Sequence, residues 1–174
     1  MESVVILNPL PNQKEIIAMM EKSAGKGFLD AEYKISLASI HPFLVTGTKL
    51  SNEEASVVEK MQCVRLNPCE GVKTWFVLEI VRLCEALNER VLVFSQYLEP
   101  LALIMDQLTR KFKWTEGKEI LLMSGNVRVK QREALMEAFN DMNSEAKVML
   151  ASTKACCERI TLVGASRVVL LDVV

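Results

Sequence analysis

The chain has 174 residues, of which 50% are hydrophobic and 25% are charged, with a formal net charge of −1. This composition is ordinary for a globular protein with a real core, and no apolar run approaches the roughly 18 residues that span a bilayer. Because the net charge is near zero, any affinity for nucleic acid must come from a local patch of basic residues.

The first part of the chain, up to about residue 68, has an irregular, mostly helical pattern. The expected elements are a short strand at 4–7, a helix around 16–20 and a weaker helix at 31–40 that ends at His41-Pro42. A third helix begins after Ser51, because Ser51 with Glu54 three positions later is the pattern of a capping box.

From about residue 69 the pattern becomes regular. The expected helices are 71–87, 98–112 and 128–142, and the expected strands are 91–94, 120–123, 148–151 and 168–171. The strands are short apolar runs without alternation, which is typical of strands covered on both faces. Strands that alternate with helices predict an α/β fold, a parallel sheet with helices on both faces.

Cysteines and basic runs add little to the functional reading. Five cysteines (Cys63, Cys69, Cys84, Cys156 and Cys157) form no CxxC pair and share the chain with one histidine, which favours buried free thiols over a metal site. The basic run Arg110-Lys-Phe-Lys113 is typical of a solvated helix end rather than of a nucleic-acid patch.

Ligands of parallel sheets lie beyond the carboxyl ends of the strands. In this sequence those positions hold Ser95-Gln96, Ser124-Gly125, Ser152-Thr-Lys154 and Asp172. Hydroxyls and N–H groups at strand-to-helix junctions can hold phosphate oxygens, but Ser and Thr there can equally cap the helices that follow. Three such sites on one edge favour a shared anionic ligand.

Four segments in order resemble motifs of the SWI/SNF-like, DNA-stimulated ATPases. Val91-Leu-Val-Phe-Ser-Gln-Tyr97 resembles helicase motif IV, and Met123-Ser-Gly125 with Gln131-Arg132 resembles the element after the next strand. The run from Lys147 to Leu162 resembles motif V, and Arg167-Val-Val-Leu-Leu-Asp172 resembles the strand after it. Three segments are also similar in sequence to the plant CLASSY-type members: Asn67-Pro-Cys-Glu-Gly-Val-Lys73, Trp114-Thr-Glu-Gly-Lys118 and Leu162-Val-Gly-Ala-Ser-Arg-Val-Val-Leu-Leu-Asp172.

The resemblance implies a RecA-like helicase C-terminal lobe at 69–174, truncated at its C-terminus, preceded at 1–68 by the end of a first lobe and a helical linker. It also implies DNA-backbone contacts, with no catalytic residue in this chain. The implied contact residues are Ser95, Gln96, Gly125, Ser152, Thr153 and Lys154.

Further expectations follow from the same resemblance. The implied partners are DNA, the absent first lobe and a plant RNA polymerase complex, and the implied setting is the nucleus, in small-RNA-directed DNA methylation. ATP and magnesium belong to the complete enzyme, and neither is expected to bind tightly to this chain alone.

The sequence departs from the family pattern in motif V. Arg159 stands where a glycine is expected and Thr161 where an asparagine is expected. A side chain at the glycine position is expected to damage the motif, although Arg159 could instead contact a phosphate.

The chain also lacks several parts of a complete motor. It has no GxxxxGK[ST] loop, no adjacent Asp-Glu pair, and no arginine-bearing motif VI after Asp172. The sequence therefore favours an incomplete motor lobe, with a non-catalytic interaction module as the alternative. An unrelated flavodoxin-like domain would not explain four motifs in order.

Overall fold

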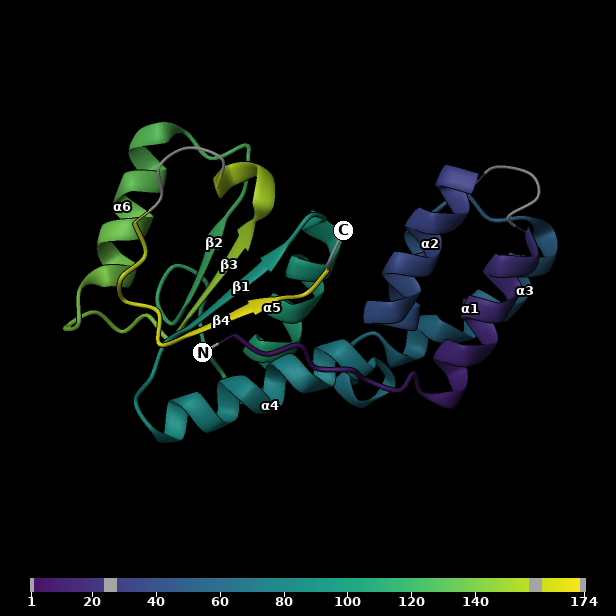
Figure 1. Ribbon diagram of the computed structural model, residues 1–174, viewed down its shortest axis with the longest axis horizontal. Helices are drawn as coiled ribbons and strands as arrows, with labels where there is room; N and C mark the ends of the chain where they lie inside the picture. Colours follow the sequence, from purple (N-terminus) through teal and green to yellow (C-terminus); the bar gives the residue numbers. More distant parts are fainter. Residues whose placement is uncertain (1, 24–27, 157–160, 173–174) are drawn as a thin grey trace. The chain divides into compact units, whose positions relative to one another are not determined.

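A computed structural model of the chain describes residues 2–23, 28–156 and 161–172 (Figure 1). Backbone contacts divide the chain into two compact units, Met1–Phe76 and Val77–Val174. The boundary expected from the sequence, after residue 68, lies slightly before this division. None of the described helices is both long and apolar enough to cross a membrane.

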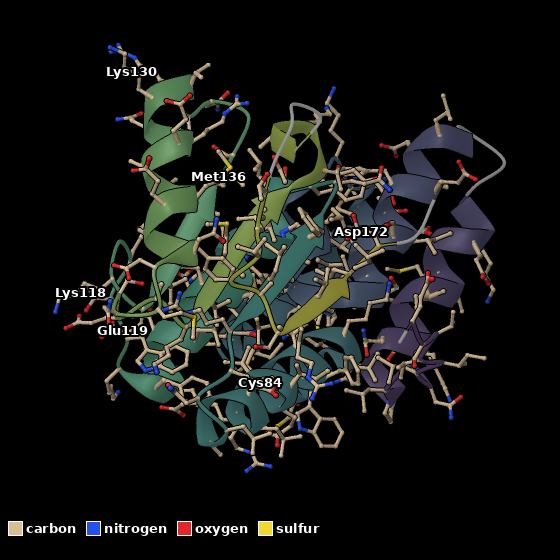
Figure 2. The ribbon with its side chains drawn as sticks, turned by 60° about the vertical axis from the view of Figure 1, so that its left-hand side comes forward. Cys84, Lys118, Glu119, Lys130, Met136 and Asp172 are labelled. Atoms are coloured by element: carbon tan, nitrogen blue, oxygen red, sulfur yellow. The ribbon has the colours of Figure 1, made fainter. Side chains whose placement is uncertain are left out.

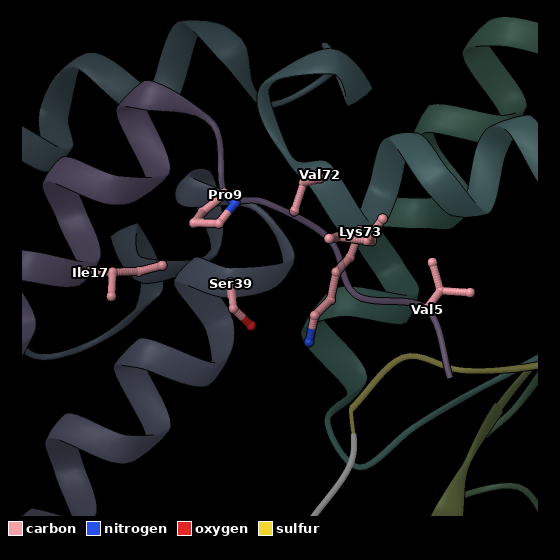
Figure 3. Close-up of a pocket in the computed structure, with 7 residues that line it drawn as sticks. Val5, Pro9, Ile17, Ser39, Val72 and Lys73 are labelled. Atoms are coloured by element: carbon pink, nitrogen blue, oxygen red, sulfur yellow. The ribbon is translucent and has the colours of Figure 1, made fainter. Parts of the chain in front are cut away.

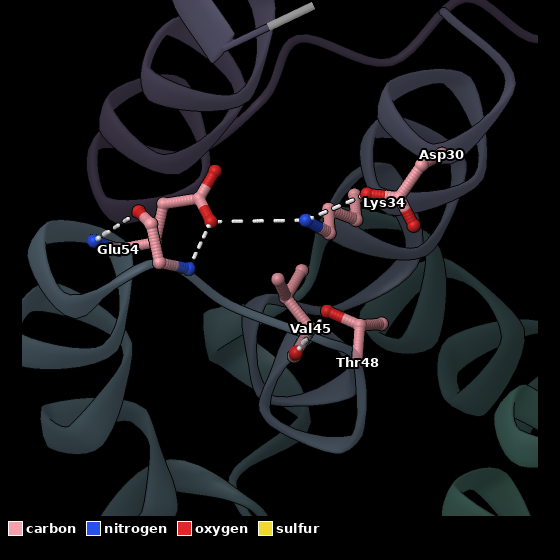
Figure 4. A network of polar contacts seen from close by, with 6 residues as sticks. Asp30, Lys34, Val45, Thr48 and Glu54 are labelled. Atoms are coloured by element: carbon pink, nitrogen blue, oxygen red, sulfur yellow. Dashed lines mark hydrogen bonds and ion pairs between the residues drawn. The ribbon is translucent and has the colours of Figure 1, made fainter. Parts of the chain in front are cut away.

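The first unit is helical. Its elements are α1 (Pro11–Ser23), α2 (Phe28–Ile40), η2 (Pro42–Gly47), α3 (Asn52–Val58), η3 (Glu59–Val64), η4 (Pro68–Glu70) and the start of α4 (Val72–Ala86). The capping box is confirmed, because the Glu54 amide donates to Ser51 Oγ over 3.3 Å and the Ser51 amide donates to Glu54 Oε2 over 2.7 Å. The buried Lys34 ammonium lies 2.8 Å from Asp30 and 3.7 Å from Glu54 (Figure 4), so the buried Glu54 carboxylate is compensated.

The strand expected at 4–7 is wrong. This segment is extended but belongs to no strand, and Val4 and Ile6 are 89% and 90% exposed. Val5 and Leu7 instead line a cavity of about 150 Å³ within the first unit (Figure 3), together with Pro9, Ile17, Ser39, Val72 and Lys73. The apolar pattern therefore reflects packing against helices, whereas a strand also needs a neighbour to pair with.

Gln13 holds three segments of the first unit together. Its side chain is fully buried, and Nε2 donates to the carbonyls of Ala38 and Ser39 over 2.9 and 3.1 Å. Its Oε1 accepts from the amides of Leu10 and Val72 over 3.3 and 3.0 Å. One amide group thus satisfies backbone groups at the end of α2 and at the starts of α1 and α4.

His41, the single histidine of the chain, is fully buried in the same unit. Its Nδ1 accepts from the Phe43 amide over 3.2 Å, so Nε2 carries the proton that it donates to the Asn67 carbonyl over 3.0 Å. A Cβ at Gly71 would lie 2.5 Å from the imidazole ring, which explains the glycine there. Burial lowers the pKa of His41, outweighing the hydrogen bond to Asn67 and the nearby Glu70 carboxylate.

The second unit is a four-stranded parallel sheet in the order β2-β3-β1-β4. The strands are β1 (Val91–Ser95), β2 (Ile120–Met123), β3 (Val148–Ser152) and β4 (Arg167–Leu170), and the connecting helices include α5 (Leu98–Phe112), α6 (Val129–Asn140) and the short η5 (Thr153–Cys156). The α/β fold with a parallel sheet expected from the sequence is confirmed.

Helices cover both faces of this sheet (Figure 1). On one face, Phe139 of α6 packs with Leu92, Leu121 and Met149. Alternate strand residues point to the other face, where α5 contacts β1 and β3 and buries Leu101, Ile104 and Leu108.

β4 is less buried than its apolar run predicts. Among the described residues it pairs with β1 alone and forms an edge, with Val168 and Leu170 exposed by 57% and 62%. An apolar run is compatible with a strand that is buried on both faces. Whether the strand is buried depends on its position in the sheet and on the elements that cover it. The expectation that the run at 168–171 is buried is therefore wrong for Val168 and Leu170.

The carboxyl end of α6 is held by the Arg90 side chain and lies close to the segment that leads into β4. The buried Arg90 guanidinium donates to the carbonyls of Phe139, Asp141 and Ser144, over 2.7 Å for Asp141 and 3.1 Å for Ser144. A cation there satisfies carbonyls that have no partner in the helix. A Cβ at Gly164 would collide with the Phe139 carbonyl, so glycine lets the chain pass close to this helix end.

The cysteine expectation holds in part. Cys63, Cys69 and Cys84 are free thiols, but only Cys84 is buried, and Cys156 and Cys157 lie beyond the described side chains. Within the described parts of the chain, no three His, Cys, Asp or Glu residues are grouped closely enough to hold a metal ion.

The His41 environment predicts a specific pH dependence of stability. The imidazole, with its lowered pKa, stays neutral when folded but gains a proton near pH 6.5 when unfolded. The unfolded state therefore binds more protons as the pH falls below about 6.5, and the free energy of unfolding should fall by at most about 1.4 kcal/mol per pH unit. Urea unfolding between pH 7.5 and 5.5, above the carboxyl range, measures this slope.

His41→Gln is the control, because the variant has no imidazole to titrate. Its free energy of unfolding should be nearly constant over the same range, even if its absolute value is lower. A flat profile for the parent chain, or an unchanged slope in the variant, would show that His41 is not the titrating group.

Candidate nucleic-acid interface

Parallel pairing brings the strand ends to one edge of the sheet. Ser95 and Ser152 are partners in register on β1 and β3, and Ser124-Gly125 and Asp172 follow the ends of β2 and β4. The four positions selected from the sequence therefore lie along the same carboxyl edge.

The loop after β1 is fixed by Asp172. The Gln96 amide donates to Asp172 Oδ2 over 2.6 Å, and the buried Ser95 hydroxyl donates to the same oxygen over 3.2 Å. Ser95 Oγ also accepts from the Tyr97 amide over 3.2 Å. The Ser95 hydroxyl and the Gln96 amide are thus used internally, whereas the Gln96 side chain is half-exposed.

In the turn after β3, the serine at the end of the strand is likewise hydrogen-bonded within the turn. Ser152 is buried, and its Oγ accepts from the Ala155 amide over 3.3 Å, which caps the turn formed by η5. Thr153 and Lys154 project from this turn and are exposed. Of the residues predicted here, Ser152 shapes the backbone and the next two side chains reach solvent.

The loop after β2 is held by Arg132. Its Nε donates to the Val127 carbonyl over 2.8 Å, and its two terminal nitrogens donate to Gly125 and Ala155 carbonyls over 2.9 and 3.4 Å. Gly125 is exposed and has open space around its Cα hydrogen positions. The sequence drew attention to Arg132 by resemblance but gave it no role.

The start of α6 nevertheless carries a sequence feature that points to this loop, a group of basic residues. The first turn has no acidic residue, but Lys130 and Arg132 lie there, next to Arg128 at the N-cap. Basic groups at a helix N-terminus are unfavourable for the helix dipole. Such a sequence indicates that something other than helix stability places positive charge there.

Positive charge at this edge is not neutralised within the described chain. Arg128, Lys130 and Lys154 are exposed and form no ion pair with a described residue. At the opposite edge Lys118 lies 2.9 Å from Glu145, which raises the pKa of Lys118, and Arg167 lies 3.1 Å from Glu89. Figure 2 shows Lys130 at one end of α6 and Lys118 near the other end.

The motif V departures are only partly visible. Arg159 lies outside the described residues, so its effect stays a prediction. Thr161 is exposed, and its carbonyl accepts from Asn140 Nδ2 over 2.8 Å. Asn140 Oδ1 in turn accepts from the Gly164 amide over 2.9 Å, which ties this segment to α6 rather than to the carboxyl edge.

Comparison with known proteins gives a consistent result. Residues 73–174 match the family described as helicase conserved C-terminal domain. The chain is 49% identical to SNF2 domain-containing protein CLASSY 3 of Arabidopsis thaliana, over 99% of this chain and 13% of that protein. It is 43% identical to CLASSY 4 of the same plant, over 99% of this chain and 16% of that protein. The chain thus spans a small part of the length of these relatives.

Solved structures share the fold. The C-terminal domain of the Sulfolobus solfataricus SWI2/SNF2 ATPase superposes with a TM-score of 0.74 and 19% identity, over 97% of this chain and 70% of that one. The core of that ATPase in complex with double-stranded DNA gives a TM-score of 0.71 and 18% identity, over 95% of this chain and 33% of that one. From its family match, its relatives and its fold, the chain belongs to the helicase conserved C-terminal domain family, in the SWI/SNF-like group that includes the CLASSY proteins.

Proposed function

We propose that this lobe holds the backbone of duplex DNA along the carboxyl edge of its sheet, as one part of an ATP-driven DNA translocase that remodels chromatin. The observation that carries the proposal is the group of exposed basic residues, Arg128, Lys130 and Lys154, which lie beside the strand-end loops and form no ion pair with a described residue. Duplex DNA is the favoured anion because a SWI2/SNF2 core of the same fold is found in complex with dsDNA.

The predicted contact residues divide into two roles. Gln96, Gly125, Thr153 and Lys154 are at least partly exposed and are the proposed contacts. Ser95 and Ser152 are buried and use their hydroxyls within the loops, so they are proposed to set the backbone shape that presents the others. Contacts to phosphates fix the position of a protein on DNA without reading its sequence.

ATP and magnesium enter the proposal through the family alone. The described residues contain no group of three potential metal ligands, and the sequence contains no GxxxxGK[ST] loop. The described residues therefore do not form a nucleotide-metal site by themselves, and no step of hydrolysis is assigned to them.

A nuclear role in small-RNA-directed DNA methylation, with a plant RNA polymerase complex as partner, is the finer form of the proposal. Its support is the 49% and 43% identity to CLASSY 3 and CLASSY 4 across nearly the whole chain. Immunoprecipitation of the full-length protein that contains this chain should recover chromatin and polymerase subunits. Recovery of polymerase subunits by a chain without DNA affinity would instead favour an interaction module.

Lys154 provides a direct test of the DNA contact. Lys154→Gln removes one positive charge from an exposed turn and should leave the fold intact. Its affinity for a duplex of arbitrary sequence should fall, and the slope of log affinity against log salt should lose about one unit in magnitude. Fluorescence anisotropy at several salt concentrations measures both quantities.

Lys113→Gln is the matched control, because Lys113 is also exposed, forms no ion pair with a described residue and lies at the opposite edge, after α5. This change should leave affinity and salt slope unaltered. The reverse outcome, with Lys113 important and Lys154 neutral, would move the DNA site to the basic run at 110–113.

Catalysis is expected to need more than this chain. Residues 1–174 should show no ATP turnover with or without duplex DNA, because they contain neither a phosphate loop nor an adjacent Asp-Glu pair. A phosphate-release assay checks this expectation. DNA-dependent release that survives repurification would contradict it.

A further inference from the structure

Two of the strand-end loops are joined through one side chain. The guanidinium of Arg132 donates to the Val127 and Gly125 carbonyls in the loop after β2 and to the Ala155 carbonyl in the turn after β3. The bonds to Val127 and Gly125 hold the loop after β2 against its own helix, and the third bond, over 3.4 Å to Ala155, links this loop to the turn after β3.

The bonds also change the electrostatic character of the edge. Carbonyl oxygens that face a phosphate repel it, and those of Gly125 and Ala155 lie beside the proposed contacts. Because Arg132 occupies these oxygens, the exposed side chains of Thr153 and Lys154 can face an anion without competing partial negative charge.

We propose that Arg132 is a positioning residue, which aligns the loop after β2 and the turn after β3 so that both engage the DNA backbone at once. The inference rests on the proposed function. Arg132 acts here through the carbonyls that it holds, not through a phosphate contact of its own. A lysine at this position would keep the charge but could not span three carbonyls on two segments.

A double-mutant cycle separates positioning from simple charge. Lys154→Gln in the parent chain should lower the salt slope by about one unit. In an Arg132→Lys background, the same change should have little further effect, which corresponds to a coupling of about threefold or more in affinity. Lys130→Gln is the charge control, because it removes a cation from the same helical turn without touching these carbonyls, and it should combine additively with Lys154→Gln.

Trypsin supplies a measurement that does not depend on DNA. Cleavage after Lys154 should be faster in Arg132→Lys, because the Ala155 carbonyl loses its partner and the turn opens more often, while cleavage after Lys118 should be unchanged. Arg132→Gln, which retains one NH₂ donor, serves as the second variant if Arg132→Lys does not fold, and its cleavage after Lys154 should be faster too.

The outcomes separate the positioning role of Arg132 from DNA binding by the chain. Additive effects of Arg132→Lys and Lys154→Gln with unchanged cleavage after Lys154 would overturn the positioning role. Absence of salt-dependent DNA binding by the parent chain would overturn the proposed function, and faster cleavage in the variant would then leave Arg132 a structural link only.

Discussion

Parallel pairing between β1 and β3 is the constraint on which the rest of this lobe depends. The two strands run in register from Val91 and Val148 to Ser95 and Ser152, and both are almost wholly buried. Because their neighbours β2 and β4 are parallel as well, every strand ends at the same edge. Helices close both faces, so the loops at the edges are where the sheet can present polar groups to a ligand.

At the carboxyl edge, internal hydrogen bonds and exposed charge have separate tasks. Asp172, Ser152 and Arg132 hold the three loops by bonds to backbone amides and carbonyls. Three exposed basic side chains, Arg128, Lys130 and Lys154, lie at this edge on a chain whose net charge is −1. This combination suits a polyanion that is gripped by its backbone rather than read by its bases.

The sequence was sufficient for the local elements of the second unit. Four apolar runs and three amphipathic helices appear close to their expected bounds, because burial on two faces leaves a strong pattern in the residues themselves. Sequence patterns failed where the burial or pairing of a segment depends on residues far away along the chain. The run at 4–7 forms no strand and packs against helices, and Val168 and Leu170 of β4 are exposed.

For the same reason, the sequence did not reveal which polar side chains hold distant segments of each unit together. Gln13 and Arg90 bond to carbonyls 25 to 54 positions away along the chain, and nothing in the local pattern marks them as buried. The role of Arg132 was weakly indicated by the sequence, because a basic residue in the first turn of α6 is unfavourable for the helix dipole. Spacing thus predicted that the candidate residues share one edge of the sheet, and the geometry was needed to divide them between holding the loops and facing a ligand.

The measurement that tests the account most directly is a map of backbone amide shifts in the ¹⁵N-labelled chain as duplex DNA is added. Binding along the carboxyl edge predicts the largest changes at 96–97, 124–130 and 153–155, with weakening of all of them as salt is raised. The loops at the opposite edge, 88–90, 113–119 and 143–147, should change little. Changes concentrated in those opposite loops, or none at the carboxyl edge at DNA saturation, would contradict the assignment of this edge to DNA.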